Sequence, residues 1–149
     1  MISIKWLPLT LKLAGEMNRL KQGEDFLDLI EPALQMQLQS ALRTTLAGVI
    51  AGSPVAELDC ELVGDSVWFS VWVAPKYRRK GIGLQAMQYL QGWAKERGMA
   101  RLVGAVEPMN TPSQRLMDKA GFTVSPKPDE DDGMLRAEFN LVEIGHRGS

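Results

Sequence analysis

The chain has few of the residues that most often bind metals or form covalent crosslinks. It contains one cysteine, Cys60, and one histidine, His146, in 149 residues. A single cysteine excludes an intrachain disulfide and a zinc site built from several cysteines. Because Cys60 lies in an apparent strand, we expect a small, buried apolar side chain. His146 lies in a polar tail, and we assign it no role.

Long apolar runs and an excess of one charge are also missing. No stretch approaches the roughly eighteen uninterrupted apolar residues that a membrane-spanning helix needs. The first residues lack the basic region and apolar run of a signal peptide, so we expect a cytoplasmic location and no membrane partner. The formal net charge is −1, which argues against nucleic acid as a partner of the whole molecule. Any cationic site must therefore be local.

The remaining composition is that of an ordinary globular protein. Hydrophobic residues make up 45% of the chain and charged residues 23%, values typical of a folded domain. The sequence has no internal repeat, no low-complexity tract and no long linker. We therefore expect a single domain over residues 1–149.

The spacing of hydrophobic residues changes within the first half of the chain. Apolar residues predict a short strand ending at Pro8, and helical spacing predicts helices over 10–21 and 25–42. Three short stretches rich in β-branched residues follow, at 46–51, 55–63 and 67–73. Tight Gly-containing turns separate them, which indicates an antiparallel meander.

The second half alternates helices with strands. Apolar residues at helical spacing over 86–94 predict a helix that ends at Gly98. Glycine suits the left-handed conformation that is common just after a helix. We then expect a strand over 101–106 and a helix over 111–120, with Thr111 as its N-cap and Pro112 at its first position. Two last strands are expected over 122–124 and 134–142. The order of elements predicts a mixed α/β or α+β layer.

Acidic residues alternate with apolar ones in the strand 55–63. Glu57, Asp59 and Glu61 would share one face, opposite a buried face. This row could receive a cationic acceptor, but the pattern favours a plain solvent-exposed sheet face.

The segment from Lys76 to Leu84 has the composition of an anion site. Four cationic side chains precede Gly81 and Gly83, and a helix begins there. The first N–H groups of a helix lack internal partners and carry a partial positive charge. Glycines remove the Cβ atoms that would keep an anion from the backbone, so the segment predicts a phosphate-binding loop.

Three interpretations of this loop compete. A nucleoside-triphosphate loop is excluded because the required Lys-Ser or Lys-Thr ending is absent. A dinucleotide site fits the glycine spacing, with Glu107 as the ribose-binding acid, but three antiparallel strands precede the loop where a direct strand-to-glycine turn is required. A basic helix start with no ligand is the remaining alternative to a coenzyme site.

Two segments resemble a known family. The stretch from Val71 to Gly83 resembles the signature of the GCN5-related N-acetyltransferase (GNAT) superfamily, with Arg78, Gly81 and Gly83 at its three defined places. The stretch from Asn110 to Phe122 is similar to the family's second segment, and the order of elements agrees along the whole chain. The resemblance implies a GNAT fold: a mostly antiparallel mixed sheet of about seven strands, helices on both faces and a splayed central strand pair.

The resemblance also implies a cofactor, acetyl-CoA. The backbone of Val71, Trp72 and Val73 would line its pantetheine arm, and one N–H group could polarise the thioester carbonyl. Asn110 would contact the pantetheine near the reacting end, although a turn residue is the alternative. The pyrophosphate would be held around Arg78, Arg79, Lys80, Gly81, Ile82, Gly83 and Leu84, and Ser113 would face the cofactor.

The sequence matches the family's catalytic residues less fully than it matches the family's cofactor site. Many relatives carry a tyrosine on the last helix as general acid, and Met117 stands at that place here. Some branches instead have a serine in this helix, which Ser113 resembles. A thiolate leaves more readily than an alkoxide because a thiol pKa is near 8.5. Glu107 is the candidate general base, with a solvated strand-end carboxylate as the alternative.

Two hypotheses follow from the sequence. The first is an N-acetyltransferase that moves acetyl from acetyl-CoA to a primary amine of a protein or small molecule. The second is a GNAT-fold protein that binds coenzyme A and acts by binding a partner protein. The acidic loop 129–132 could attract a cationic acceptor, but charge runs are more often only solvated. A homodimer is common in the family, and no feature of this sequence specifies one.

Overall fold

The computed structural model describes residues 3–21 and 42–142. Within these residues, seven strands form a sheet in the order β1-β2-β3-β4-β5-β7-β6. Most neighbouring strands are antiparallel, and β4 and β5 are parallel. The predicted mixed, mostly antiparallel sheet is therefore confirmed. The chain divides into two compact units, residues 1–61 with 71–86 and residues 62–70 with 87–149, and each is described in turn.

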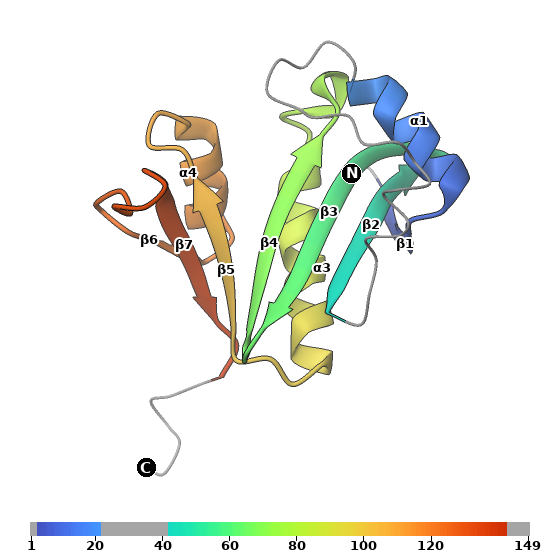
Figure 1. Cartoon of the computed structure of the whole chain (residues 1–149). Helices are drawn as coiled ribbons and strands as arrows, with labels where there is room; N and C mark the ends of the chain where they lie inside the picture. Colours follow the sequence, from blue (N-terminus) through green and yellow to red (C-terminus); the bar gives the residue numbers. More distant parts are fainter. Residues whose placement is uncertain (1–2, 22–41, 143–149) are drawn as a thin grey trace. The chain divides into compact units, whose positions relative to one another are not determined.

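The first unit contains the N-terminal half of the sheet. Strand β1 and helix α1 come first, and Figure 1 shows α1 lying over β2 and β3. Helix α1 begins where the Thr10 hydroxyl accepts a hydrogen bond from the Leu13 N–H at 3.1 Å, a typical N-cap. The elements are β1 (Lys5–Pro8), α1 (Leu11–Lys21), β2 (Arg43–Ile50), β3 (Ser53–Val63), the end of β4 (Ser66–Val73), the short η1 (Pro75–Tyr77) and the start of α3 (Ile82–Glu96).

Apolar side chains in this unit form two clusters, which contain residues of different helices. Ala14 and Met17 of α1 pack with Ala47, Trp72 and other apolar residues of one face. Ile82, the first residue of α3, packs with Val55 and Ala56.

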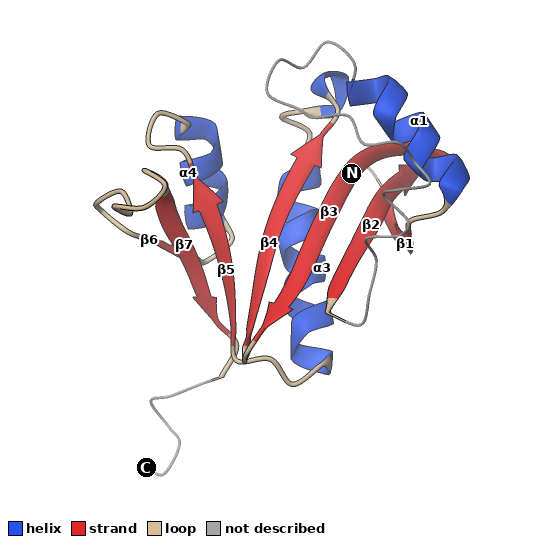
Figure 2. Cartoon of the chain, viewed as in Figure 1, coloured by secondary structure: helices blue, strands red, loops and turns tan. Residues whose placement is uncertain are grey.

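The second unit holds the remaining strands and the last helix. It contains most of β4 and α3, together with β5 (Arg101–Val106), α4 (Thr111–Lys119), β6 (Thr123–Val124) and β7 (Leu135–Asn140). Figure 2 shows the opposed directions of β5 and β7. The parallel register of β4 and β5 runs from Ser66 opposite Arg101 to Phe69 opposite Gly104, and both strands continue past it.

Aromatic side chains pack around Gly104 in this unit. A Cβ atom at Gly104 would lie 2.6 Å from Cζ of Phe69, so only glycine leaves room for that ring. Phe69 packs edge-on against Phe122, with centroids 5.6 Å apart, and Phe122 packs against Phe139 at 5.3 Å. Aromatic pairs at these distances are favourable beyond their buried area.

Most predicted elements are confirmed with shifted ends, and two predictions are wrong. The N-cap of α4 is Asn110 rather than Thr111, because the Asn110 side chain accepts a hydrogen bond from the Ser113 N–H. The acidic face of β3 is not simply exposed, because Glu57 is 5% exposed beneath α1. Cys60 is buried as predicted. The helix predicted over 25–42 lies almost wholly outside the described residues, as does His146.

Candidate functional site

The predicted phosphate-binding loop lies in the first unit and is tied to the sheet at both ends. At the end of β4, the Ala74 N–H donates to the Val55 carbonyl oxygen at 2.8 Å. The Arg78 Nε donates to the Val73 carbonyl oxygen at 2.8 Å. After the loop, Ile82 is buried in the core. The loop is thus held between two fixed points, which keeps its backbone groups in place.

The backbone of the loop enters the left-handed region at two residues. Arg79 has φ +62° and Gly81 has φ +82°. A left-handed non-glycine residue is uncommon and costs free energy, and such residues gather at functional sites. Turns of this kind can point successive N–H groups toward one concave space that binds an anion. A Cβ atom at Gly81 would meet no atom within 4 Å, so the space above the backbone is open.

The start of α3 adds further donors. The Gln85 N–H donates to the Gly81 carbonyl oxygen at 3.1 Å, so the helical ladder begins there. The N–H groups of Ile82, Gly83 and Leu84 precede that bond and have no acceptor within the helix. The first turn of α3 contains no acidic residue, and the helix dipole places partial positive charge at this end.

Charge in the loop has one sign. The side chains of Lys76, Arg78, Arg79 and Lys80 are all exposed. The loop therefore offers four cations and a row of N–H groups to an anion, and the residues present fit a pyrophosphate.

The end of β4 can form further backbone hydrogen bonds along the edge that faces away from β3. Because the Ala74 N–H bonds to β3, alternation places the N–H groups of Val71 and Val73 on the opposite edge. The Val73 carbonyl oxygen accepts from Arg78, and the Val73 N–H faces the same edge as the Val71 N–H. The Trp72 side chain lies on the face covered by α1.

The other predicted site residues lie in the second unit. Glu107 is exposed just beyond β5, and its carbonyl oxygen accepts from the Asn110 N–H at 2.9 Å in a tight turn. The Asn110 side-chain oxygen accepts from the Ser113 N–H at 3.1 Å. Asn110 therefore caps α4, a role that the sequence predicted for Thr111. Ser113 is half-buried in the first turn of α4, and Met117 is buried one turn later.

A buried ionic cluster in the first unit was not predicted. Lys21, the last residue of α1, places Nζ 3.0 Å from Oε1 of Glu57 and 5.4 Å from the Trp72 ring centroid. Asp59 accepts a hydrogen bond from the Thr45 hydroxyl at 2.7 Å. Burial, and then the nearby Asp59 carboxylate, raise the pKa of Glu57 to about 7, although Lys21 opposes the shift. The acidic alternation in β3 was the available signal, but nothing in the sequence paired it with Lys21.

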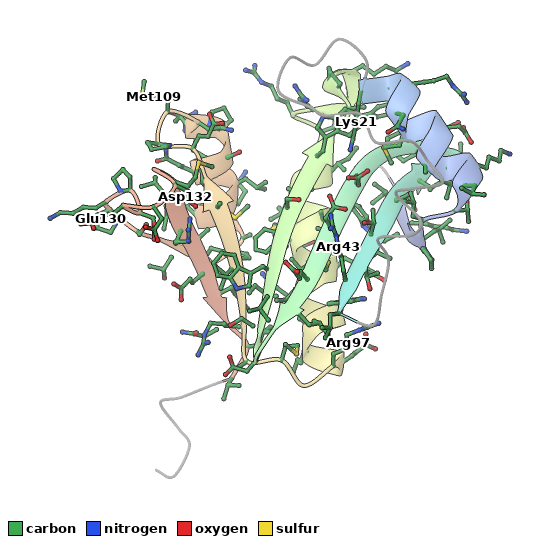
Figure 3. All side chains as sticks on the ribbon, viewed as in Figure 1. Lys21, Arg43, Arg97, Met109, Glu130 and Asp132 are labelled. Carbon is green, nitrogen blue, oxygen red and sulfur yellow. The ribbon has the colours of Figure 1, made fainter. Side chains whose placement is uncertain are left out.

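The second unit carries a shallow hollow on its sheet. Its volume is about 500 Å³, and it is lined by Ser66, Trp68, Arg101, Val103, Arg136, Glu138 and Asn140. The Arg136 guanidinium lies 5.5 Å from the Trp68 ring and 2.8 Å from Oδ2 of Asp132, in the acidic loop labelled in Figure 3. The hydrogen bond from Arg136 lowers the pKa of Asp132. Part of the acidic loop is therefore neutralised within the fold.

Neither a metal site nor a membrane span is found in the described part of the chain. No group of three or more His, Cys, Asp or Glu side chains within residues 3–21 and 42–142 is arranged to bind a metal. In the same residues, no helix is long and apolar enough to cross a membrane.

Comparisons with known proteins agree with the loop geometry. A family model, Acetyltransferase (GNAT) family, matches residues 17–122. A search of curated proteins finds no significant match. Among solved structures, the ribosomal-protein-S18-alanine N-acetyltransferase from Escherichia coli is similar, with 18% identity, a TM-score of 0.75 and coverage of 97% of this chain and 98% of that one.

Two further structures show the same fold. The structure of yncA from Salmonella typhimurium with its cofactor acetyl-CoA has 16% identity and a TM-score of 0.74, with coverage of 95% and 96%. A chimera of the spermidine N-acetyltransferase SpeG from Vibrio cholerae and hSSAT has 12% identity and a TM-score of 0.78, with coverage of 93% and 95%.

Proposed function

Because the chain belongs to the GNAT acetyltransferase family, whose members use acetyl-CoA, we propose that it transfers the acetyl group directly to a primary amine. The amine is a protein lysine, a protein N-terminus or a small amine. The solved relatives named above include an enzyme named for a protein alanine and a chimera named for spermidine, so both acceptor classes occur within the fold.

The observation that carries the proposal is the loop between β4 and α3. Its left-handed Arg79 and Gly81, the open space over Gly81 and the four exposed cations support a site for a pyrophosphate there. The N–H groups from Arg79 to Leu84 would hold the two phosphates. Their fixed position costs no reorganisation when the cofactor binds.

The chain's own residues have distinct roles in the proposed reaction. Acetyl-CoA supplies an acyl group on a good thiolate leaving group. The N–H groups of Val71 and Val73 would bind the pantetheine arm and the thioester oxygen. Glu107 would accept the proton of the incoming amine, directly or through water. Ser113 would contact the cofactor, and Asn110 would do so while capping α4.

We also propose that the two compact units act as one catalytic domain. The cofactor loop lies in one unit, whereas Glu107, Asn110 and Ser113 lie in the other. A complete reaction would require both. A homodimer and a cytoplasmic location remain part of the same proposal.

A second function is favoured by one observation in α4. Met117 is 4% exposed and cannot donate a proton to the leaving thiolate. A protein that binds acetyl-CoA and acts through a partner protein would need no such donor.

Release of free coenzyme A thiol from acetyl-CoA separates the two functions. We expect turnover with at least one member of a panel of alkylamines, polyamines, lysine peptides and peptides with free N-termini. The Glu107→Gln variant should lose most of that turnover, about a hundredfold or more for loss of a general base, and keep its cofactor affinity. Tight acetyl-CoA binding with no turnover on any acceptor would favour the binding protein.

A further inference from the structure

The buried cluster beneath the end of α1 has the composition of a site for an organic cation. Glu57 lies opposite Ala47 of β2. The bond between Ala74 and Val55 sets the antiparallel register on the other side, which places Trp72 beside Glu57. Side chains of directly opposed residues share a face. A small residue, a carboxylate and an indole therefore lie in a row across three strands.

The ammonium group of Lys21 contacts two members of this row. It lies 3.0 Å from Oε1 of Glu57 and 5.4 Å from the centroid of Trp72. These are the two contacts by which proteins bind alkylammonium ions, a charge-assisted hydrogen bond and a cation–π contact. Lys21 is the last residue of α1, so its side chain reaches the row from the end of that helix.

The row contains a buried ion pair. Glu57 shares a hydrogen bond with Asp59 and lies beside the Lys21 ammonium. Burial of an ion pair gives little net stability compared with apolar packing of the same volume. Stability alone therefore gives weak reason for a carboxylate, a cation and an indole to be buried together at this place.

The location of the row suits an acceptor. Trp72 lies between Val71 and Val73, the residues whose backbone would bind the pantetheine arm. The row contains Trp72 of the cluster that packs with α1, whereas Ile82, where α3 begins, packs in the other cluster of this unit. An amine bound in the row would approach β4 from the side that α1 covers.

We propose that Glu57 and Trp72 form a binding site for a linear primary alkylammonium group of the acceptor, and that Lys21 occupies this site in the free protein. The substrate class is an aliphatic amine such as a lysine side chain or a polyamine. The proposal rests on the proposed acetyltransferase function for the identity of the ligand as acceptor. Lys21 is then an internal competitor that the acceptor displaces.

Binding of n-butylammonium, measured by calorimetry in the absence of acetyl-CoA, tests the site without any acyl transfer. A site that is free in only about a tenth of molecules has an apparent affinity lowered about tenfold. We therefore expect Lys21→Ala to bind n-butylammonium at least about tenfold more tightly than the wild type. Measurement at about pH 9 keeps the probe charged, since alkylamines resemble lysine with a pKa of about 10.4, and lies above the pKa of about 7 of Glu57 in the wild type.

Three controls define the result. Lys12→Ala, in the exposed first turn of α1, should bind n-butylammonium as the wild type does. Adding Glu57→Gln to Lys21→Ala should abolish the gain, and the uncharged probe 1-butanol should not bind. Equal affinity in Lys21→Ala and wild type, or a gain that survives Glu57→Gln, would overturn the proposal.

A second measurement uses the wild-type chain and does not depend on folding of the variant. Lysine labelled with ¹⁵N reports the ammonium group of Lys21 by NMR. Addition of n-butylammonium should move that signal toward those of the exposed lysines. A Lys21 signal that stays unchanged up to saturating probe contradicts displacement. Failure of either binding experiment leaves acetyl-CoA turnover untouched, so it is distinct from failure of the proposed function.

Discussion

Replacement of Glu57 by glutamine should remove a large part of the pH dependence of folding stability. The Glu57 side chain is 7% exposed, and the charged groups that shift its pKa are Lys21 of α1 and Asp59 of its own strand. Thr45 of β2 donates a hydrogen bond to Asp59, and Trp72 of β4 lies beside the Lys21 ammonium. Burial is the largest cause of its raised pKa, and the Asp59 carboxylate is the next.

The sign and size of the effect follow from the shift. The pKa of Glu57 rises from 4.5 to about 7 on folding, so between these values the folded chain holds a proton that the unfolded chain releases. Stability from this group is therefore fully present below about pH 4.5 and is lost as pH rises through about 7. At about 1.4 kcal/mol per pKa unit, the loss is about 3 kcal/mol.

Urea unfolding at several pH values between about 5 and 8 measures this loss directly. The difference in unfolding free energy between wild type and Glu57→Gln should change by about 3 kcal/mol across that range, because subtraction removes the titration of all other groups. Thermal midpoints should diverge by roughly 6–12 °C. Glu61→Gln, an exposed position on the same strand, is the matched control and should follow the wild type.

Parallel curves for wild type and Glu57→Gln would refute the reasoning. They would mean that Glu57 has the same pKa in the folded and unfolded chains. A wild type that becomes more stable relative to the variant as pH rises would reverse the sign, and would mean that Lys21 outweighs burial.

Two further predictions concern the second unit. Gly104→Ala should destabilise the fold by about 1–3 kcal/mol, because the added Cβ would lie 2.6 Å from the Phe69 ring. Gly92→Ala, in open space on α3, is the control and should be neutral or stabilising by up to about 1 kcal/mol. Urea unfolding of the two variants measures the difference. Asn110→Ala should cost about 1 kcal/mol through loss of the cap on α4, whereas Asn110→Asp keeps an acceptor oxygen and should stay within a few tenths; equal losses in both variants would contradict the capping role.

The strands and helices were largely predictable because hydrophobic residues recur in them at a clear strand or helix spacing. The meander of β2, β3 and β4 follows from tight turns and β-branched runs, and the parallel pairing of β4 with β5 follows from the family topology. The loop before α3 was predicted from charge and glycine alone. Its left-handed Arg79 was not, because side-chain chemistry gives arginine no preference for positive φ.

The errors came from tertiary context. Alternation in β3 indicated a polar face correctly, but only the packing of α1 decides that Glu57 is buried there. Asn110 and Thr111 are both good caps, and the turn that bonds the Asn110 N–H to Glu107 decides which of them precedes the first helical residue. Pairing of Lys21 with Glu57 joins residues far apart in the sequence, so no local pattern could show it.

Acetyl-CoA binding to Gly81→Glu tests the central claim, that the loop between β4 and α3 holds the cofactor's pyrophosphate. Gly52→Glu is the matched control, because Gly52 has φ +83° and, like Gly81, open space where a Cβ atom would lie. Both variants carry the same backbone strain and the same added charge. We expect calorimetry to show loss of acetyl-CoA binding in Gly81→Glu and wild-type affinity in Gly52→Glu. Retained affinity in a folded Gly81→Glu protein would contradict the account.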